Sequence, residues 1–158
     1  MITAVALLLF ARSNMVAQPG TAEVRGTIGY TTFLDEAPQH HLLTGGSVRI
    51  YVTRRLSVEP EFLFLYRSER DKDIIAWPQI AYDFADPGSR VIPYVIGGVG
   101  LMHSIFPRFS TTESAVSGGF GMKVFVNDRV FVAPEARLGF EPILRFSVSV
   151  GYAFGAKR

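Results

Sequence analysis

The feature that most constrains the fold is an alternation of apolar and polar residues with a period of two. It is clearest in residues 123–138, where the even strand positions are apolar and the charged residues Lys123, Glu135 and Arg137 all fall on odd positions. Such a period is typical of a β-strand with two different faces. The stretch is interrupted at 127–129 by Asn-Asp-Arg, which favours a turn. The segment is therefore predicted to form a tight β-hairpin.

The same pattern occurs earlier in the chain, at residues 49–61. Aligned without a gap, the segments 49–61 and 123–135 share five residue pairs: Val52/Val126, Arg55/Arg129, Val58/Val132, Pro60/Pro134 and Glu61/Glu135. A hairpin that recurs this closely predicts a fold built by repeating one up-and-down unit.

Alternation and turn signals along the rest of the chain predict eight strands and no helix. The expected strands are 22–34, 46–53, 57–67, 74–84, 91–102, 117–126, 130–138 and 145–154, with the longest loop at 103–113. A length of 158 residues with 15 Gly and 13 Phe fits one all-β domain. The absence of cysteine excludes a disulfide framework, and a net charge of +2 without a basic tract gives no indication of nucleic-acid binding.

The first 17 residues are predicted to be a signal peptide. The run Ile2 to Ala11 is apolar apart from Thr3, and it is shorter than the roughly 20 residues that a membrane-spanning helix needs. It has the length of a signal-peptide core, with a plausible cleavage site after Ala17. The alternative is a buried N-terminal strand or helix. Residues 18–158 are then the barrel domain.

Charged residues mark one face of every predicted strand that carries them. The eleven within the strands all have odd numbers: Glu23, Arg25, Arg49, Glu59, Glu61, Arg67, Asp83, Lys123, Glu135, Arg137 and Arg145. A soluble barrel would place these charges outside, as in a lipocalin-like protein, whereas a membrane barrel would place them in its lumen.

Three features favour the membrane barrel. The charges are near balance, with Arg more frequent than Lys, and Arg is the better partner for buried carboxylates. The apolar face is uniformly large and would overfill the interior of eight strands. Aromatic residues lie near strand ends, as in the girdle of a membrane interface; they are Tyr30, Tyr66, Trp77, Tyr82, Tyr152 and Phe154. The predicted fold class is an all-β, eight-stranded, antiparallel, up-and-down transmembrane β-barrel.

An isolated charge in so narrow a lumen is unfavourable, so the inward charges are expected to pair. The predicted network is an ionic plug formed by Arg49, Glu59, Glu61, Lys123, Glu135, Arg137 and Arg145. The alternative is a set of scattered charges solvated by lumen water.

On these residues the mature chain resembles the small eight-stranded outer-membrane β-barrel family, the OmpA/OmpX type with a porin-like domain. The resemblance rests on the hairpins around Thr53 and Asp128, on the stretch 93–100, and on the segment 148–154. That last segment is similar to the family's terminal assembly signal, although Gly155-Ala-Lys-Arg158 follows its final aromatic residue.

The resemblance implies the outer membrane of a Gram-negative-type envelope, with both termini in the periplasm. It implies tight periplasmic turns at about 53–55, 85–89 and 127–129 and outward loops at 35–45, 67–74, 103–114 and 139–144. The implied partners are outer-membrane lipid and the barrel-assembly machinery, the latter through the C-terminal strand; no loop partner is indicated.

Catalytic and ligand-binding patterns are weak in comparison. His103, Ser104 and Glu113 suggest an outer-leaflet lipid hydrolase, but adjacent strand residues point to opposite faces and the His-x-Ser spacing of barrel deacylases is absent. His40–His41 lack a third metal ligand at suitable spacing, and the glycines at 97–100 do not form a nucleotide fingerprint. No catalytic residue, metal or cofactor is therefore predicted.

The predicted function is that of an integral outer-membrane protein with a structural or surface-interaction role. The alternatives are an outer-leaflet lipid-modifying hydrolase, a narrow diffusion pore and a soluble lipocalin-like ligand-binding barrel.

Overall fold

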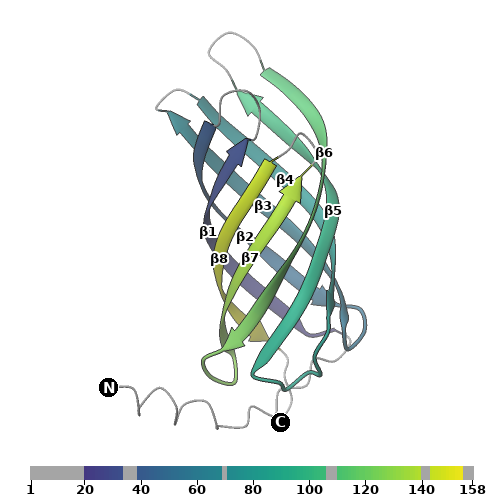
Figure 1. The fold of residues 1–158 in the computed structure, drawn as a ribbon. Coiled ribbons are helices and arrows are strands. Elements are labelled where there is room, and N and C mark those ends of the chain that lie inside the picture. The colour runs from purple at the N-terminus through teal and green to yellow at the C-terminus, as the bar shows by residue number, and fades with distance from the viewer. Residues whose placement is uncertain (1–19, 34–38, 69–70, 106–109, 140–142, 155–158) are drawn as a thin grey trace, which may run out of the picture.

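The computed structural model describes residues 20–33, 39–68, 71–105, 110–139 and 143–154 as one closed, up-and-down β-barrel (Figure 1). Every strand pairs with its neighbours in sequence, and β8 pairs with β1 to close the barrel. The strands are β1 (Ala22–Phe33), β2 (Gln39–Tyr51), β3 (Leu56–Ser68), β4 (Asp71–Asp83), β5 (Val91–Ile105), β6 (Ser110–Phe125), β7 (Val130–Gly139) and β8 (Ile143–Phe154). Within these ranges, no helix is long and apolar enough to cross a membrane.

Closure of the barrel is what makes the fold compatible with a bilayer. All eight neighbouring pairs are antiparallel, and β1 matches β8 over its full length, from Ala22↔Phe154 to Phe33↔Ile143. A sheet without free edges bonds its backbone groups internally, and no water is present in hydrocarbon to bond them otherwise.

Three short connections, at 52–55, 84–90 and 126–129, lie at one end of the barrel, here called the turn end. The β2–β3 and β6–β7 turns are closed by the same bonds. The nitrogens of Val52 and Val126 donate to the carbonyls four residues on, both at 2.9 Å. Thr53 and Asn127 use their side-chain oxygens to accept from the backbone of the following strand. The repeated hairpin predicted from the sequence is confirmed.

Several strands extend further toward the opposite end, the loop end, than the alternation indicated. The expected loop at 103–113 is wrong: β5 continues to Ile105, β6 begins at Ser110, and the two pair from Met102↔Glu113 to Ile105↔Ser110. Strand β2 likewise begins at Gln39 and β4 at Asp71. Backbone pairing does not require an apolar face, so strands continue beyond the apolar part of the wall. The predicted signal peptide, residues 1–17, lies outside the described residues.

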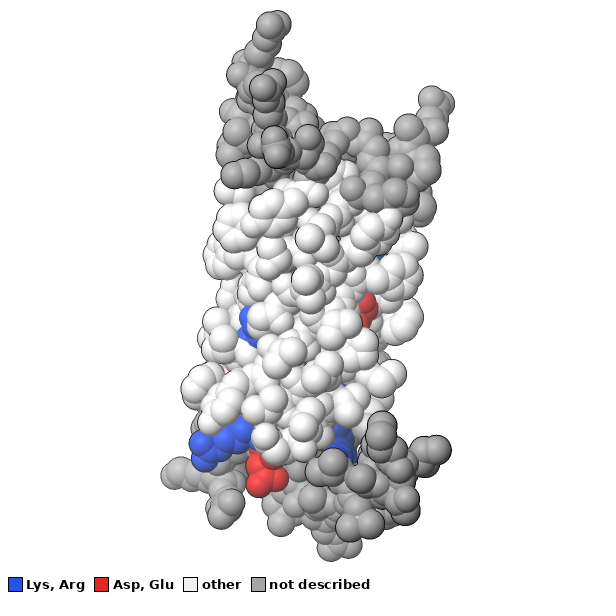
Figure 2. Space-filling model, turned by 90° about the vertical axis from the view of Figure 1, so that its left-hand side faces the viewer, with Lys and Arg blue, Asp and Glu red and all other residues white. Residues whose placement is uncertain are grey.

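The outer surface is apolar over the middle of the barrel. Large apolar side chains at outward positions are 37–66% exposed. Figure 2 shows a mostly white wall, with the largest coloured patches near the turn end and small blue and red patches at mid-height. In water such a continuous apolar surface would be a severe liability; in lipid it is matched to its solvent. The faces are oriented as in a transmembrane barrel.

Strand β5 is the exception to the odd-inward rule. Its inward residues are Ile92, Tyr94 and Ile96, whereas the odd-numbered Val95 and Val99 face outward. This strand carries no Asp, Glu, Lys or Arg, so the pattern of charges held no information about its orientation. The reversal brings Tyr94 into the lumen.

Candidate functional site

The charged lumen is the most distinctive site of the molecule. Ten of the eleven charges predicted to face inward are described, and all are buried: Glu23, Arg25, Arg49, Glu59, Glu61, Asp83, Lys123, Glu135, Arg137 and Arg145. Because each occupies the inward position of its strand, the barrel brings together five acidic and five basic residues from seven strands. The described lumen charges therefore balance.

The first group of ion pairs, the turn-side cluster, consists of Glu23, Arg25, Arg49, Glu59, Asp83 and Lys123. The ammonium of Lys123 donates to Glu23 Oε1 at 3.1 Å and to Asp83 Oδ2 at 2.6 Å, and it also contacts the Tyr51 hydroxyl. The Tyr51 hydroxyl lies 2.9 Å from Glu23 and 2.8 Å from Asp83. All three donors of the ammonium are thus used within the barrel.

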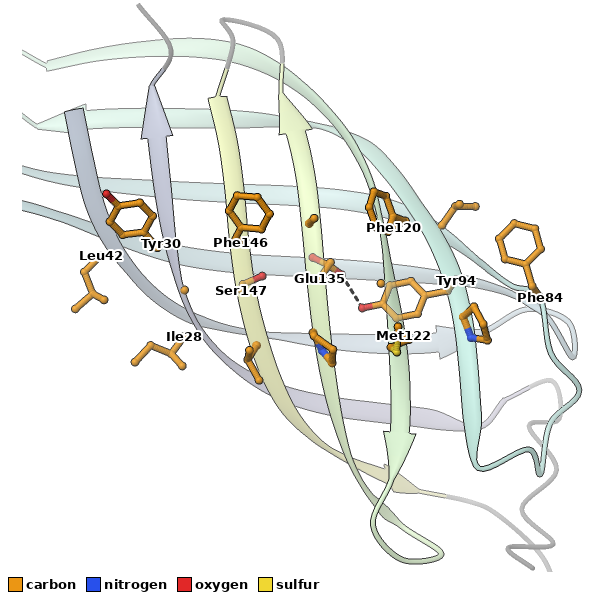
Figure 3. Close-up of a pocket in the computed structure, with 17 residues that line it drawn as sticks. Ile28, Tyr30, Leu42, Phe84, Tyr94, Phe120, Met122, Glu135, Phe146 and Ser147 are labelled. Carbon is orange, nitrogen blue, oxygen red and sulfur yellow. Dashed lines mark hydrogen bonds between the residues drawn. The ribbon is translucent and has the colours of Figure 1, made fainter. Parts of the chain in front are cut away.

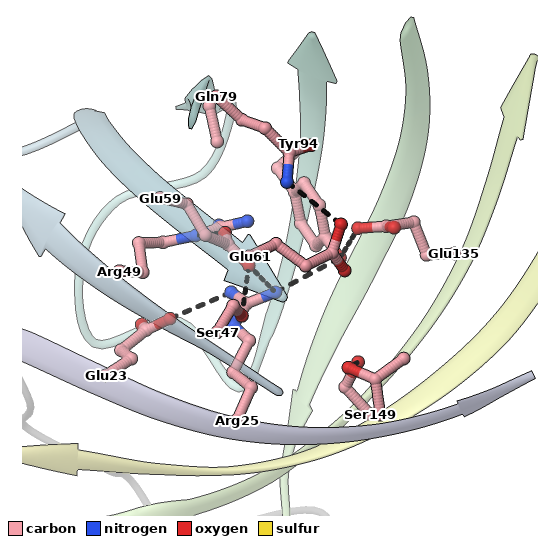
Figure 4. Close-up of polar contacts among 12 residues, drawn as sticks. Glu23, Arg25, Ser47, Arg49, Glu59, Glu61, Gln79, Tyr94, Glu135 and Ser149 are labelled. Atoms are coloured by element: carbon pink, nitrogen blue, oxygen red, sulfur yellow. Dashed lines mark hydrogen bonds and ion pairs between the residues drawn. The ribbon is translucent and has the colours of Figure 1, made fainter. Parts of the chain in front are cut away.

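Two arginines complete the turn-side cluster (Figure 4). Arg49 donates through Nε to Glu59 Oε2 at 2.5 Å, and Arg25 donates through Nη2 to Glu23 Oε2 at 2.8 Å. Ser47 adds a bond to Glu59 at 2.6 Å. Arg49 also stacks on the ring of Tyr94, with its guanidinium 4.5 Å from the ring centre, a cation–π arrangement strengthened by exclusion of water.

The second group, the loop-side cluster, consists of Glu61, Gln79, Glu135, Arg137 and Arg145. Both terminal nitrogens of Arg145 donate to the Glu61 carboxylate, at 2.6 and 3.0 Å. Arg137 joins Glu61, at 3.1 Å, to Glu135, which its Nε contacts. Gln79 donates to Glu61 at 3.0 Å. A bidentate pair such as Arg145–Glu61 is the strong form of the interaction between arginine and carboxylate.

Tyr94 connects the two clusters. Its hydroxyl accepts from Arg25 Nη1 at 3.4 Å and donates to Glu135 Oε2 at 2.8 Å. The ring fits because Gly121 lies opposite it on β6, where a Cβ would stand 2.7 Å from ring atoms. A side chain at Gly121 would displace the residue that joins the clusters.

Apolar residues flank the charges at both ends. Toward the turn end lies a cluster of Ile92, Phe125, Phe131, Ala133 and Ala153. Toward the loop end lies a second cluster of Leu43, Leu63, Leu65, Ile75 and Trp77. Beside this second cluster, Arg137 and Arg145 line a cavity of about 40 Å³, which is large enough only for very small molecules such as water.

The seven network residues predicted from the sequence all lie in these two clusters. Glu23, Arg25 and Asp83 were recognised as inward charges but were not named as members of the pairing set. Gln79, Tyr51 and Tyr94 were missed altogether. Uncharged inward positions could have suggested Gln79 and Tyr51, whereas Tyr94 carried no signal because the parity of β5 is reversed.

Of the predicted interface aromatics, one is corrected. Tyr30, Tyr66, Tyr82 and Phe154 are 40–50% exposed on the outer wall, and Tyr152 is half-buried there. Trp77 instead points into the lumen, where it is 7% exposed and packs with Leu63. Its odd position on β4 puts it on the same face as Gln79, and Gly100 on the neighbouring strand β5 leaves space for its indole.

A groove in the outer wall crosses β7 (Figure 3). Its volume is about 740 Å³, and it exists because Pro134 and Ala136 are small compared with Phe120 on β6 and Phe146 on β8. Glu135 lies behind this wall, hydrogen-bonded to Tyr94. The groove is lined mainly by apolar side chains and faces the same side as the lipid-exposed wall.

The residues considered for catalysis and metal binding are only partly described. The side chains of His103, Ser104 and Glu113 lie outside the described set, although their backbones are paired in β5 and β6. His41 is buried on the inward face of β2. No group of three or more His, Cys, Asp or Glu residues in the described ranges could hold a metal ion.

Comparison with known proteins agrees with this geometry. No protein-family model matches the chain, and no curated protein matches it significantly. Among solved structures, the N-terminal β-barrel domain of Pseudomonas aeruginosa OprF is similar, with a TM-score of 0.70, 17% identity and coverage of 87% of this chain and 98% of that one.

Two further structures have the same architecture. Neisserial surface protein A has a TM-score of 0.65 and 12% identity, with 86% of this chain and 96% of that chain covered. Ail of Yersinia pestis, solved with the heparin analogue sucrose octasulfate, has a TM-score of 0.62 and 11% identity, with 87% and 100% covered. The fold is that of the small eight-stranded outer-membrane β-barrels, the OmpA/OmpX type.

Proposed function

We propose that this protein is a structural barrel of a Gram-negative-type outer membrane, with a lumen closed by its own ion pairs. The apolar wall supports insertion into lipid, and the likeness in fold to three outer-membrane barrels supports that particular membrane. The observation that carries the closed lumen is the pairing of all ten described inward charges, five of each sign.

The ion pairs favour a plug over a pore for an energetic reason. An ion entering the lumen would have to displace contacts such as Arg145–Glu61 or Lys123–Asp83, and parting a buried pair leaves two charges without compensation. The apolar clusters at either end add a barrier to water. The role that we propose is structural, with the loops at the loop end meeting the surroundings.

The orientation belongs to the same proposal. The first residue of β1 pairs with the last residue of β8 at the turn end, so both ends of the barrel domain emerge there. We assign the turn end to the periplasm and the loop end to the cell exterior. The C-terminal strand β8 would then present its outward residues, including Phe146 and Phe154, to the barrel-assembly machinery during insertion.

Single-channel recording in planar bilayers tests the closed lumen. The wild-type barrel, shown to be folded by a heat-dependent shift in gel mobility, is expected to give no discrete conductance. A variant that opens the loop-side cluster, Arg137→Ser with Arg145→Ser, is expected to increase ion leakage. Discrete wild-type openings would contradict the plug and favour the diffusion pore.

Cell fractionation tests the location. Recovery of the full-length protein in the outer-membrane pellet, with its loops cleaved by protease added to intact cells, is the expected result. Recovery as a soluble periplasmic protein would contradict membrane insertion and return attention to a ligand-binding barrel.

A further inference from the structure

The two repeated hairpins each place an arginine at the turn-end rim in the same way. Arg55 and Arg129 are equivalent in the sequence repeat, and each precedes the first residue of a strand. Their backbone carbonyls accept from the next strand along the barrel: Asp83 N–H bonds Arg55 at 2.9 Å, and Ala153 N–H bonds Arg129 at 2.8 Å. These bonds fix the backbone of both arginines at the rim of the turn end.

In each hairpin, the residue just before the one that bonds the arginine carbonyl is an outward-facing tyrosine, Tyr82 beside Arg55 and Tyr152 beside Arg129. Arg129 Nη1 donates to the Tyr152 hydroxyl at 3.0 Å. The tyrosine packs against a phenylalanine two residues further on, with ring centres 4.7 Å apart for Tyr152–Phe154 and 5.5 Å apart for Tyr82–Phe84. Each arginine, with its tyrosine and phenylalanine, forms one unit. The unit spans the boundary between the apolar wall and the charged rim.

The two units differ in the partner that each guanidinium binds. At Arg55, the carboxylate of Asp86 lies 2.5 Å from Nη2, so an anion from the chain itself already occupies the guanidinium. Arg129 is exposed, and no carboxylate of the described residues forms an ion pair with it; neighbouring Asp128 acts on it only as a nearby charge. Of the five N–H donors of Arg129, the described contacts use only the one that meets Tyr152.

We infer that Arg129 and Tyr152 form a binding site for the phosphate of an anionic phospholipid in the leaflet at the turn end. The chemistry follows from the matched unit, where the same guanidinium position holds an oxyanion. The source follows from Phe154 and Tyr152, since their rings lie on the apolar wall that contacts acyl chains. Asp86 acts as an internal substitute for the headgroup at Arg55. This inference rests on the membrane insertion proposed above.

Native mass spectrometry of the refolded full chain, released from micelles titrated with phosphatidylglycerol or phosphatidylcholine, tests the site. The wild type is expected to retain one phosphatidylglycerol in preference to phosphatidylcholine. Arg129→Gln is expected to weaken that binding about tenfold, as fits the loss of one charge-assisted contact. The matched variant Arg55→Gln is expected to bind as the wild type does, and Asp86→Asn is expected to retain a second phosphatidylglycerol.

Three outcomes would overturn the inference. They are wild-type affinity in Arg129→Gln, equal retention of both lipids, and displacement of phosphatidylglycerol by an equal concentration of soluble glycerol phosphate, which would make the ligand a free anion. Each sample is first checked for the heat-dependent mobility shift. A wild-type chain that never shows the shift would contradict the proposed membrane barrel itself, whereas a shifted barrel without lipid preference contradicts only this site.

Discussion

The two clusters in the lumen have the same net charge but different surroundings. In the turn-side cluster, Arg49 and Lys123 are 0–1% exposed, and the centre of the Phe131 ring lies 5.1 Å from the guanidinium of Arg25. In the loop-side cluster, Glu135 and Arg145 are both 8% exposed, and Arg145 borders a cavity. Charge balance alone therefore does not set how much an ion pair contributes to the free energy of unfolding. The free energy of unfolding also depends on whether water can reach the charge that remains when its partner is removed.

The largest effect is expected for Lys123→Met. The change leaves three buried carboxylates, Glu23, Glu59 and Asp83, with only two arginines of the cluster to balance them. Among the described residues, Asp83 then keeps only Arg49, at 3.4 Å, and the Tyr51 hydroxyl. Removing one partner from a buried ion pair typically destabilises a protein by about 3–5 kcal/mol. The free energy of unfolding in urea, measured in lipid vesicles, is the readout. A loss below about 1 kcal/mol would show that water reaches this cluster as readily as the other.

A smaller effect is expected for the matched change Arg145→Met in the loop-side cluster. Glu61 keeps its bonds to Arg137 and Gln79, and the adjacent cavity can admit water to the vacated position. The expected loss is about 1–3 kcal/mol, the range for leaving a buried polar group partly unsatisfied. The same urea titration measures it. A loss equal to that of Lys123→Met would remove the distinction between the clusters.

A still smaller loss of stability is expected when the connection between the clusters through Tyr94 is removed. Tyr94→Phe keeps the ring under Arg49 but removes the hydroxyl that bonds Glu135 and Arg25. The expected loss is about 1 kcal/mol, as for one ordinary hydrogen bond. Gly121→Ala provides the contrasting control, because its methyl group would collide with the ring and should cost more than the hydroxyl alone. Equal stability of Tyr94→Phe and the wild type would contradict a bridging role.

The smallest effect is expected in the quenching of Trp77 fluorescence by lipid, which distinguishes a side chain in the lumen from one on the outer wall. Trp77 is the only tryptophan, and its side chain lies in the lumen. Its fluorescence should be quenched only weakly by lipids brominated on their acyl chains. The control is Trp77→Phe with Phe120→Trp, which moves the indole to a position that is 66% exposed on the outer wall. Equal quenching of the two proteins would contradict the inward placement of Trp77.

Alternation predicted most of this site because side-chain direction in a strand has a period of two. Once the number of one inward charge is known, every charge on a regular strand follows, and all ten described charges obeyed the rule. The rule cannot be carried between strands without knowing the length of each connection. Inward residues have odd numbers on β4 and even numbers on β5, because of the length of the turn at 84–90. Tyr94 therefore faces inward, and no charged residue on β5 indicates this.

Alternation and turn chemistry were enough to predict the class of fold, the eight strands, the positions of the tight turns and which side of seven strands is charged. These properties are local, since they depend on period and turn chemistry within a few residues. The assembled barrel was needed to show that Trp77 lies inside the lumen, that β5 turns its even-numbered residues inward, and which acid pairs with which base. Glu61 and Arg145 are 84 residues apart in sequence, and their contact depends on closure of the barrel and on its register, to which every strand contributes.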